Sequence, residues 1–344
     1  MDKLAILIPC YNESRTIAKV VSDCLKYCQK YRVKIYVYDN NSQDDTGAIA
    51  KKAGAIVRYE HKQGKGNVLR RMLQDIEAEC YILIDGDDTY PAELIEKMAQ
   101  YVLEHDVDMV IGDRLSSTYF SENKRPFHNL GNALVRNVIN KVFKSDIKDV
   151  MTGFRALSYR FAKSFPVLSQ GFEIETEMTI HAIDKNMTLS TIPVEYRDRP
   201  NGSHSKLNTY KDGVKVLNTI VKLFQTYKPY EYFGMIALVL FVTAMAVFVP
   251  VVYIPYCQTG LVAHYPTLIV CGFGVIAAVV SYFSGLILST IVQKDRQEFE
   301  FRLHLIKMMD SLAAQLEDTR LQPSSIVKIV EDSEGLKRVD QKGQ

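Results

Sequence analysis

One long stretch of this sequence carries no charged side chain. From Tyr232 to Gln293 there is no Asp, Glu, Lys or Arg, although the 344-residue chain holds 42 Lys and Arg and 40 Asp and Glu in total. One membrane span needs about 20 predominantly apolar residues, so this stretch is long enough for two. The sequence therefore predicts an integral membrane protein rather than a wholly soluble one.

The uncharged stretch divides into two candidate spans, Phe233–Ile254 and Pro266–Val292. The connecting residues 255–265 contain no Lys or Arg, whereas basic residues flank the outer sides of both spans: Lys222, Lys228, Lys294 and Arg296. The positive-inside rule then places both termini in the cytoplasm. A buried hairpin in a soluble protein is the alternative interpretation.

Before the spans, apolar runs alternate with stretches of helical spacing. The predicted strands are Leu4–Pro9, Lys34–Tyr38, Ala55–Tyr59, Tyr81–Asp85 and Asp108–Gly112. The predicted helices between and after them are Glu13–Lys30, Asp45–Ala53, Gly66–Ala78 and Ala92–Glu104. Strict alternation of this kind is typical of an α/β fold with a parallel sheet.

Charge and cysteine content exclude other classes of protein. A net charge of +2 does not suit a nucleic-acid binder, which must neutralise many phosphates. The six cysteines form no CxxC pair and have no His partner at zinc-ligand spacing, so we expect reduced thiols. The N-terminal residues lack the long apolar region of a signal peptide, and residues 1–231 are therefore expected in the cytoplasm.

Two loops that follow predicted strands carry side chains suited to ligands, which bind beyond the carboxyl ends of strands in open sheets. Asp39–Ser42 follows the second strand, and a helix-capping turn is its alternative interpretation. Asp85–Asp88 holds three carboxylates in four residues, which repel one another unless a cation offsets them. Hard divalent ions prefer oxygen ligands, so this loop predicts a Mg²⁺ or Mn²⁺ site, with a solvated turn as the alternative.

Glycine and basic residues provide weaker signals. Gly64-Lys65-Gly66 fits neither the P-loop nor the dinucleotide fingerprint, although it could present backbone amides at a helix start. Residues 197–206 combine Arg, Gly, Ser and Lys in a cationic loop suited to phosphate oxygens, with an exposed hairpin as the alternative. A predicted helix, Phe172–Lys185, and a predicted strand, Leu189–Tyr196, precede this loop.

A basic amphipathic pattern covers Lys206–Gln225, directly before the first span. Such a helix is typical of the membrane surface, and packing on the soluble domain is the alternative. After the second span, apolar residues recur at three- and four-residue steps from Phe299 to Leu316. This pattern predicts an amphipathic helix whose apolar stripe contacts the bilayer, the catalytic domain or a second copy, and we favour a homo-oligomer.

The ordered set of motifs resembles family 2 glycosyltransferases with the GT-A fold, specifically the polyprenyl-phosphate glycosyltransferases similar to dolichol-phosphate mannosyltransferase. The motifs are Ile8-Pro9-Cys10-Tyr11-Asn12-Glu13, the Asp39 loop, Gly64-Lys65-Gly66, Asp85-Gly86-Asp87, Asp149 with Gly153-Phe154-Arg155, and the Arg199–Lys206 loop. The resemblance covers about residues 3–226, and the two spans are similar to the bacterial membrane-anchored branch. It implies a mostly parallel, Rossmann-like catalytic domain in residues 1–205, a juxtamembrane region in 206–231, two spans in 232–293, a cytoplasmic helix in 294–320 and a polar tail in 321–344.

The resemblance implies a nucleotide-sugar donor, a polyprenyl-phosphate acceptor and a divalent metal on the donor diphosphate. Carried over by position, the nucleotide-sugar ligands are Pro9, Tyr11, Glu13, Asp39, Lys65, Asp85 and Gly86, and the metal ligands are Asp85 and Asp87. The residues for acceptor and phosphate contacts are Arg114, Arg125, Arg136 and Ser205, and the catalytic candidates are Asp149, Asp87, Arg199 and Lys206. A phosphate acceptor is largely ionised at neutral pH, so Asp149 is either a base or a residue that orients a basic side chain.

Two departures from the family pattern limit this carry-over of residues, and the second of them, at Thr89, weakens a mannose assignment. Asn40-Asn41 stands where many relatives have Asp-Gly, and Thr89 stands where the mannosyltransferases often have Gln. The resemblance to the bacterial branch favours inverting transfer from UDP-glucose or a UDP-N-acetylhexosamine to undecaprenyl phosphate, which makes a lipid-linked sugar donor for cell-envelope glycans. GDP-mannose is the alternative donor.

Two alternative functions belong to other classes of protein. A processive polysaccharide synthase carries a Gln-x-x-Arg-Trp motif, and this chain has no Trp. A non-catalytic scaffold that binds a nucleotide sugar is disfavoured by the intact Asp85 and Asp87 pair.

Overall fold

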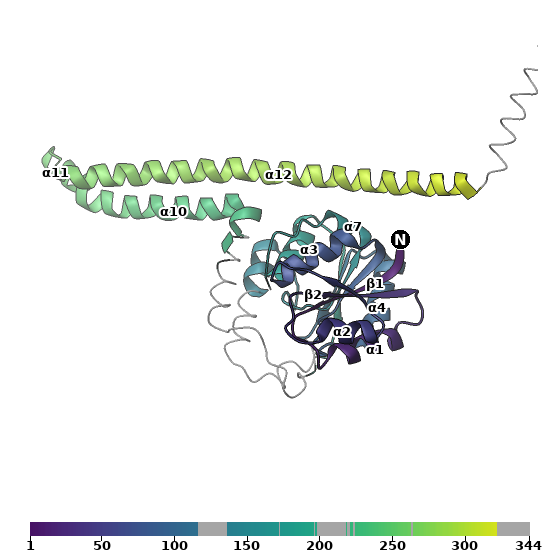
Figure 1. Cartoon of the computed structure of the whole chain (residues 1–344). Coiled ribbons are helices and arrows are strands. Elements are labelled where there is room, and N and C mark those ends of the chain that lie inside the picture. The colour runs from purple at the N-terminus through teal and green to yellow at the C-terminus, as the bar shows by residue number, and fades with distance from the viewer. Residues whose placement is uncertain are drawn as a thin grey trace, which may run out of the picture. The chain divides into compact units, whose positions relative to one another are not determined.

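A seven-stranded sheet forms the centre of the N-terminal region (Figure 1). The computed structural model describes residues 1–115, 136–171, 173–195, 197, 218, 221–222, 224–262 and 264–321. The strands are β1 (Asp2–Cys10), β2 (Val33–Asp39), β3 (Ile56–Tyr59), β4 (Ala78–Leu83), β5 (Met109–Asp113), β6 (Arg155–Ser158) and β7 (Leu189–Pro193). Their order across the sheet is β3-β2-β1-β4-β6-β5-β7.

The sheet is mostly parallel, as the sequence predicts. β1 pairs in parallel with β2 and β4, β2 with β3, and β5 with β7. Only β6 runs antiparallel, between β4 and β5. The sequence analysis did not predict β6, a strand of four residues. The carboxyl ends of β1, β2, β4 and β5 consequently meet the start of β6 at one edge of the sheet.

Helices cover both faces of the sheet. They are α1 (Ile17–Tyr27), α2 (Thr46–Lys52), α3 (Lys65–Asp75), α4 (Ile95–His105, after the short 3₁₀ turn Ala92–Leu94), α7 (Tyr159–Ser164) and α8 (Ile174–Asp184). Figure 1 shows α1 and α2 on one face and α3 and α7 on the other. Alternating and continuous apolar runs in the strands supply the core, in which residues of β1, α1 and α4 are fully buried.

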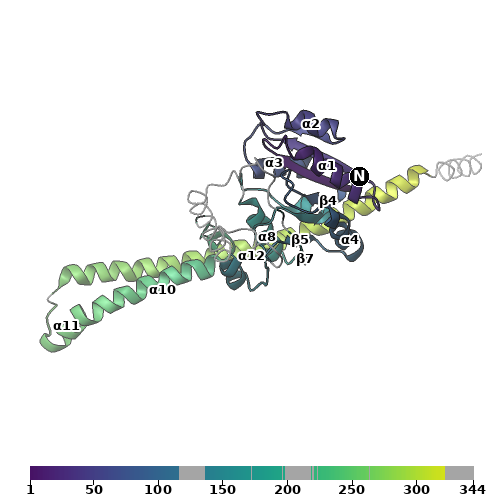
Figure 2. The ribbon, with the colours of Figure 1, turned by 90° about the horizontal axis from the view of Figure 1, so that it is seen from below.

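Two apolar helices follow the sheet domain. The first runs through α10 (Pro229–Phe248), the π-helical turn Val249–Tyr253 and α11 (Ile254–Thr259), and the second is α12 (Tyr265–Leu321). Both are long and apolar enough to cross a membrane, judged by length and composition. Figures 1 and 2 show α10 beside α12 from two directions. Small residues allow this close approach, since a Cβ on Gly274 would lie 3.2 Å from the Cβ of Ala244.

The chain divides into two compact units, Met1–Arg296 and Gln297–Gln344. The first contains the sheet domain and the two apolar helices up to Arg296. In the second, α12 continues as a helix to Leu321. The predicted polar tail beyond this point and most of the predicted Lys206–Gln225 helix lie outside the described residues.

Candidate active site

The loops after β1 and β2 are tied together at the carboxyl edge of the sheet. Ser42 Oγ accepts a hydrogen bond from the Asn12 backbone N–H at 2.9 Å, and Asn12 Oδ1 accepts one from the Gln43 N–H at 2.7 Å. Asn12 and Asn41 both have positive φ, which asparagine tolerates well among non-glycine residues. Asp39, at the end of β2, accepts the Ser42 N–H at 2.9 Å. The direction of the buried Asp39 carboxylate at the end of β2 is thus fixed.

The acidic loop after β4 separates its three carboxylates. Asp87 is buried, and its Oδ1 accepts the hydroxyl hydrogen of Thr89 at 2.6 Å. Asp88 has positive φ and pairs with Lys19 of α1 at 2.7 Å, which gives it a partner outside the site. A Cβ on Gly86 would lie 2.7 Å from Cys10 Sγ, so a larger residue here would require the Cys10 side chain to move. Of the three carboxylates, Asp88 is therefore the one that α1 holds.

Lys65, the first residue of α3, lies between two carboxylates. Its ammonium donates to Asp85 Oδ1 at 2.6 Å and to Glu175 Oε1 at 2.8 Å, and Glu175 comes from the first turn of α8. Burial disfavours the charged ammonium, but the charges of Asp85 and Glu175 outweigh burial and raise the pKa of Lys65. Lys65 therefore stays protonated. The three residues also line a small pocket with Pro9 and Gly153.

The glycines on either side of Lys65 have a packing role. A Cβ on Gly64 would lie 2.2 Å from the carbonyl oxygen of Gln170, and one on Gly66 would lie 2.1 Å from that of Ser169. The Gly66 N–H donates to the Gln170 carbonyl at 3.0 Å, and the Gly64 N–H donates to Asn40 Oδ1 at 2.8 Å. The expectation that this segment presents its glycine amides to a ligand is wrong, because protein acceptors already hold both.

Arg114, directly after β5, is clamped by Asp149. The guanidinium donates from Nε to Asp149 Oδ2 at 2.8 Å and from Nη2 to Oδ1 at 3.1 Å, which is a bidentate pair. The Arg114 backbone N–H adds a bond to Oδ2 at 3.2 Å, and the Met151 N–H adds one to Oδ1. Asp149 is only 1% exposed. This geometry orients Arg114 and leaves Asp149 poorly placed to accept a proton from a substrate.

Residues 150–155 connect the arginine clamp with the acidic loop. Tyr90 Oη accepts the Gly153 N–H at 3.0 Å. The fully buried Arg155 donates to the carbonyls of Val150 at 2.8 Å and Thr152 at 3.0 Å, and burial lowers the pKa of its guanidinium to about 10. Arg155 therefore holds the segment in place. At Gly153 a Cβ would lie 2.6 Å from Asp85 Oδ2, so only glycine permits this approach.

The described residues include most of the predicted site. Pro9, Tyr11 and Glu13 lie at and after the end of β1, Asp39 ends β2, and Gly86 lies in the acidic loop. Arg136 is partly exposed on the helical segment 136–143. Four predicted residues lie outside the described residues: Arg125, Arg199, Ser205 and Lys206.

Sequence reasoning assigned no role to Glu175 or Tyr90. Glu175 is one of the three glutamates that open the predicted Phe172–Lys185 helix, but nothing in the sequence indicates a lysine 110 positions earlier as its partner. Tyr90 follows the acidic loop directly, and its contact with Gly153 depends on the placement of β6 beside β4. The sequence feature that could have indicated a role for Tyr90 is its position two residues after Asp88 in the acidic loop.

The donor chemistry of the acidic loop fits a divalent metal ion. Among the described residues, no group of three or more His, Cys, Asp or Glu side chains could hold a metal ion without further ligands. Two carboxylates completed by phosphate oxygens of a substrate form the kind of site that Mg²⁺ prefers. Asp85 and Asp87 would supply the protein oxygens of such a site.

Comparisons with known proteins agree with this architecture. The family model described as "Glycosyl transferase family 2" matches residues 5–164, which contain β1 to β6 and the acidic loop. Glycosyltransferase AglJ of Haloferax volcanii is 29% identical over 300 residues, covering 87% of this chain and 97% of AglJ. Protein RfbJ of Shigella flexneri is 45% identical over 111 residues, covering 32% of this chain and 84% of RfbJ.

A third relative is named for its substrate, and solved structures share the fold. The dolichyl-phosphate hexose transferase of Haloferax volcanii is 26% identical over 222 residues, covering 64% of this chain and 94% of the relative. Glucosyl-3-phosphoglycerate synthase of Mycobacterium tuberculosis, solved with Mn²⁺, UDP and its product, superposes with a TM-score of 0.51 at 19% identity, covering 65% of this chain and 79% of that one. The predicted GT-A fold is confirmed, and the chain belongs to glycosyltransferase family 2.

Proposed function

We propose that this protein transfers one sugar, with inversion, from a nucleotide-sugar donor to a polyprenyl phosphate at the cytoplasmic face of a membrane. The observation that carries the proposal is the sheet edge at which the Asp85–Asp87 loop follows β4 and the clamped Arg114 follows β5, in a chain that continues into two apolar helices. A carboxylate pair suits a metal–diphosphate, and an oriented guanidinium suits a second phosphate. One site thus has groups for both donor and acceptor.

The acceptor proposal rests on membrane proximity and on phosphate chemistry. The Haloferax relative named dolichyl-phosphate hexose transferase matches over 64% of this chain. A phosphate monoester has its second pKa near 6 and is largely ionised at neutral pH, so it needs no strong base before it attacks. Arg114 would hold the acceptor phosphate near the donor diphosphate against their mutual repulsion. The cationic residues Arg125, Arg199 and Lys206, together with the neutral Ser205, remain candidates for the same task.

The donor would lie over the ends of β1, β2 and β4. Asp39, fixed by the Ser42 N–H, would accept hydrogen bonds from the nucleoside, and Asp85 and Asp87 would face the diphosphate. Bound Mg²⁺ or Mn²⁺ would neutralise the diphosphate leaving group. We favour a UDP-sugar because Thr89 replaces the Gln that the mannosyltransferases often carry, and Thr89 here binds Asp87.

Asp149 is proposed as a positioning residue rather than as the base. Its two oxygens are engaged by Arg114 and by the Met151 N–H, and its side chain is buried. An ionised phosphate acceptor makes a base dispensable. The rate of transfer then depends on the orientation of the Arg114 guanidinium relative to the acceptor phosphate.

The proposed membrane arrangement places the catalytic domain and both termini in the cytoplasm. Lys and Arg residues flank the outer ends of the two apolar helices, and residues 255–265 contain no Lys or Arg. A homo-oligomer built through the 299–316 stripe also stays a proposal.

A donor panel tests the proposed function. The full-length protein in membranes would receive UDP-glucose, UDP-N-acetylglucosamine, UDP-N-acetylgalactosamine or GDP-mannose, with and without undecaprenyl phosphate. We expect nucleoside diphosphate release from a UDP-sugar that depends on the lipid phosphate. Release only from GDP-mannose would overturn the donor proposal, and binding without release for every donor would support a scaffold instead.

A further inference from the structure

Asn40, directly after β2, uses the whole hydrogen-bonding capacity of its side-chain amide. Its Nδ2 donates to the backbone carbonyls of Glu60 at 2.7 Å and Lys62 at 2.8 Å. Its Oδ1 accepts from the Gly64 backbone N–H at 2.8 Å and from Gln63 Nε2 at 3.2 Å. An amide has two N–H donors and one oxygen with two lone pairs, so these four bonds occupy all of it. The residue is also buried, with 3% of its surface exposed.

The partners of this side chain require an amide. The carbonyls of Glu60 and Lys62 can only accept hydrogen bonds, and the Gly64 N–H can only donate one. An ionised aspartate at this position would lose both donated bonds and would direct a carboxylate oxygen at two carbonyl oxygens in a buried place. These contacts are a physical reason for Asn40 where many relatives have Asp.

The same side chain lies between two parts of the proposed donor site. The residue before it is Asp39, which would hold the nucleoside. The loop 60–64, which the amide holds by four bonds, leads directly into α3, and the first residue of α3 is Lys65. Lys65 donates to Asp85 at 2.6 Å, in the loop that would face the diphosphate. One buried amide thus connects the nucleoside end of the proposed site with its diphosphate end.

We infer that Asn40 is a positioning residue of the donor site, whose amide fixes the loop 60–64, and through it the start of α3, relative to Asp39. This inference rests on the proposed function, because it takes Asp39 as a nucleoside ligand and the Asp85 loop as the place of the diphosphate. Since its amide is fully occupied, Asn40 acts through the main chain of the loop rather than through a bond to the donor.

A nucleoside diphosphate is the ligand that would depend on this connection. It must contact both ends of the site at once, so its affinity depends on a spacing that is set before it binds. A nucleoside without phosphates contacts one end and does not depend on that spacing. Loss of the Asn40 amide should therefore weaken the binding of the diphosphate far more than the binding of the nucleoside.

The test compares the Kd values of UDP and uridine for the purified full-length protein, by isothermal titration calorimetry with Mn²⁺ present. Asn40→Asp should raise the Kd for UDP by about tenfold, because two donated bonds are lost and a buried carboxylate faces carbonyl oxygens. The Kd for uridine should change by less than about twofold. A variant that is only less stable would lose affinity for both ligands equally, so this difference separates positioning from stability.

Asn41→Asp is the matched control, because it makes the same substitution and the same change of charge one residue further along. The Asn41 side chain is exposed and donates to the His61 carbonyl at 2.8 Å and to Gln63 Oε1 at 3.4 Å. Asparagine and aspartate both tolerate its positive φ. The Kd of this variant for UDP should stay within about twofold of the wild type.

Asn40→Ala is the second variant, which removes the amide without adding a charge and decides the question if Asn40→Asp fails to fold. It too should bind UDP about tenfold more weakly, with uridine binding little changed. A variant of Asn40 that is folded by circular dichroism and binds UDP as tightly as the wild type would overturn the inference. Equal losses of affinity for UDP and uridine would also overturn it.

The binding measurements separate this inference from the proposed function. Sugar transfer is not measured, so a wrong lipid acceptor or a wrong sugar would leave these Kd values unchanged. A wild-type protein that binds GDP in place of UDP would contradict the donor proposal alone, and the same comparison with GDP and guanosine would then decide the inference. A wild-type protein that binds neither nucleoside diphosphate would overturn both.

Discussion

Carboxylates at the sheet edge differ in the partners that hold them. Asp88 pairs with Lys19, Asp149 with Arg114, and Asp85 with Lys65. Asp87 accepts a hydroxyl hydrogen bond from Thr89. Chemically identical side chains within a few residues of one another therefore have different tasks, which the sequence alone does not separate.

Removal of the Asp87 carboxylate should reduce sugar transfer far more than removal of the Asp88 carboxylate. Asp87→Ala, or EDTA added to the wild type, should reduce sugar transfer to below about a tenth, because metal neutralisation of the diphosphate supplies several kcal/mol. Asp88→Ala should be much milder, since its carboxylate pairs with Lys19. Initial rates with a saturating donor provide the measurement, and circular dichroism checks folding. Equal losses in the two variants would argue against the division of roles.

Arg114 and Asp149 should behave as one unit. Arg114→Ala and Asp149→Asn should each lower kcat/KM for the lipid phosphate by about 10- to 100-fold, the value of a charge-assisted hydrogen bond. The double variant should be no worse than the more damaging single variant, because both act through the same guanidinium. If Asp149 were the base, Asp149→Asn would instead lower kcat far more than Arg114→Ala.

Among the elements, α8 joins two ends of the domain. Its first turn supplies Glu175 to Lys65 and Glu177 to the backbone N–H groups of Leu168 and Ser169. At its C-terminal end, Asp184 Oδ1 accepts from Arg296 Nε at 3.0 Å. Every residue from Ile174 to Ala182 is buried. The helix therefore has no solvent-exposed polar face along these residues, and other parts of the domain surround it.

His181 on α8 should make stability depend on pH. Its ring packs against Phe161 and Phe165, and burial, with a smaller effect of Lys185, lowers its pKa from 6.5 to about 4, despite the opposing charges of Asp184 and Asp295. Above pH 6.5 the imidazole is neutral in both folded and unfolded states. Below that, the unfolded chain binds a proton that the folded protein does not, so the free energy of unfolding falls until about pH 4.

His181→Phe should remove this part of the acid sensitivity while filling a similar volume. The loss of unfolding free energy between pH 7 and pH 4 should be smaller in the variant by up to about 3 kcal/mol. Melting curves of the two full-length proteins in detergent, recorded by circular dichroism across this range, provide the comparison. If the unfolding free energies of the two proteins changed with pH in the same way, the pKa of His181 would be the same in the folded and unfolded states.

Local patterns predicted the elements better than they predicted their contacts. Apolar periodicity identified β1, β2, β3, β4 and β5, because each is an apolar run beside a helix of 3.6-residue spacing, although the edge strand β3 is partly exposed. It missed β6, since four residues that enter between two existing strands have too little length to show a period. The predicted helix Glu13–Lys30 begins at Ile17 instead, because Glu13 to Thr16 form the turn that reaches the β2 loop.

The site was predictable only in part for the same reason. Asp85 and Asp87 were found because closely spaced carboxylates after a strand are rare without a cation. Lys65 was interpreted as a ligand for the nucleotide, and its actual partners include Glu175, 110 residues away. The Gly64 and Gly66 amides could not be assigned either, since the main chain at Ser169 and Gln170 that approaches them comes from a distant segment.

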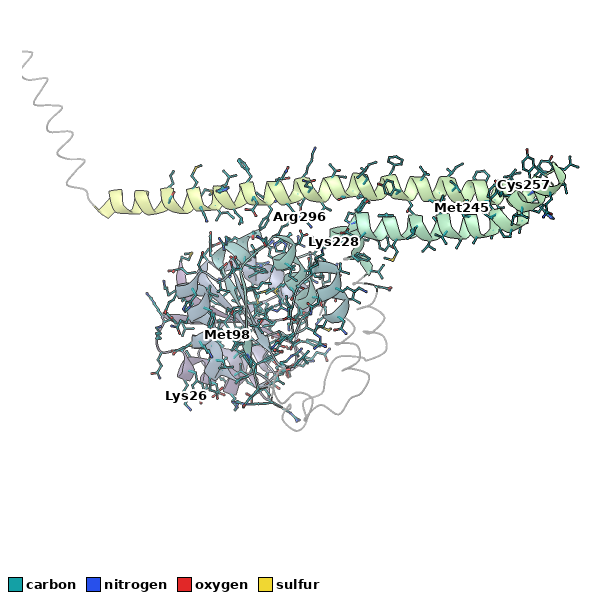
Figure 3. The ribbon with its side chains drawn as sticks, turned by 180° about the vertical axis from the view of Figure 1, so that it is seen from behind. Lys26, Met98, Lys228, Met245, Cys257 and Arg296 are labelled. Carbon is teal, nitrogen blue, oxygen red and sulfur yellow. The ribbon has the colours of Figure 1, made fainter. Side chains whose placement is uncertain are left out.

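At the scale of the whole molecule, one exposed cysteine reports on membrane topology. Cys257 in α11 is exposed, and the other five cysteines are buried. Figure 3 shows Cys257 at the connecting end of the helical hairpin, with Lys228 and Arg296 at the opposite end. A hairpin with cytoplasmic basic ends would place Cys257 on the far side of the membrane.

Labelling of Cys257 tests this topology. A membrane-impermeant maleimide added to intact cells should modify the wild type, and Cys257→Ser should abolish the signal. Labelling that appears only after the cells are lysed would place the connecting segment in the cytoplasm and contradict the proposed arrangement.

The central claim is that a single sugar is transferred to a lipid phosphate, and mass spectrometry of the lipid product tests it most directly. Full-length protein would be incubated with the donor panel, Mg²⁺ or Mn²⁺ and undecaprenyl phosphate, beside the Asp87→Ala variant. We predict a lipid whose mass exceeds that of the acceptor by one sugar residue, and its absence with Asp87→Ala. A polymeric product, or free sugar without any glycosylated lipid, would contradict the account.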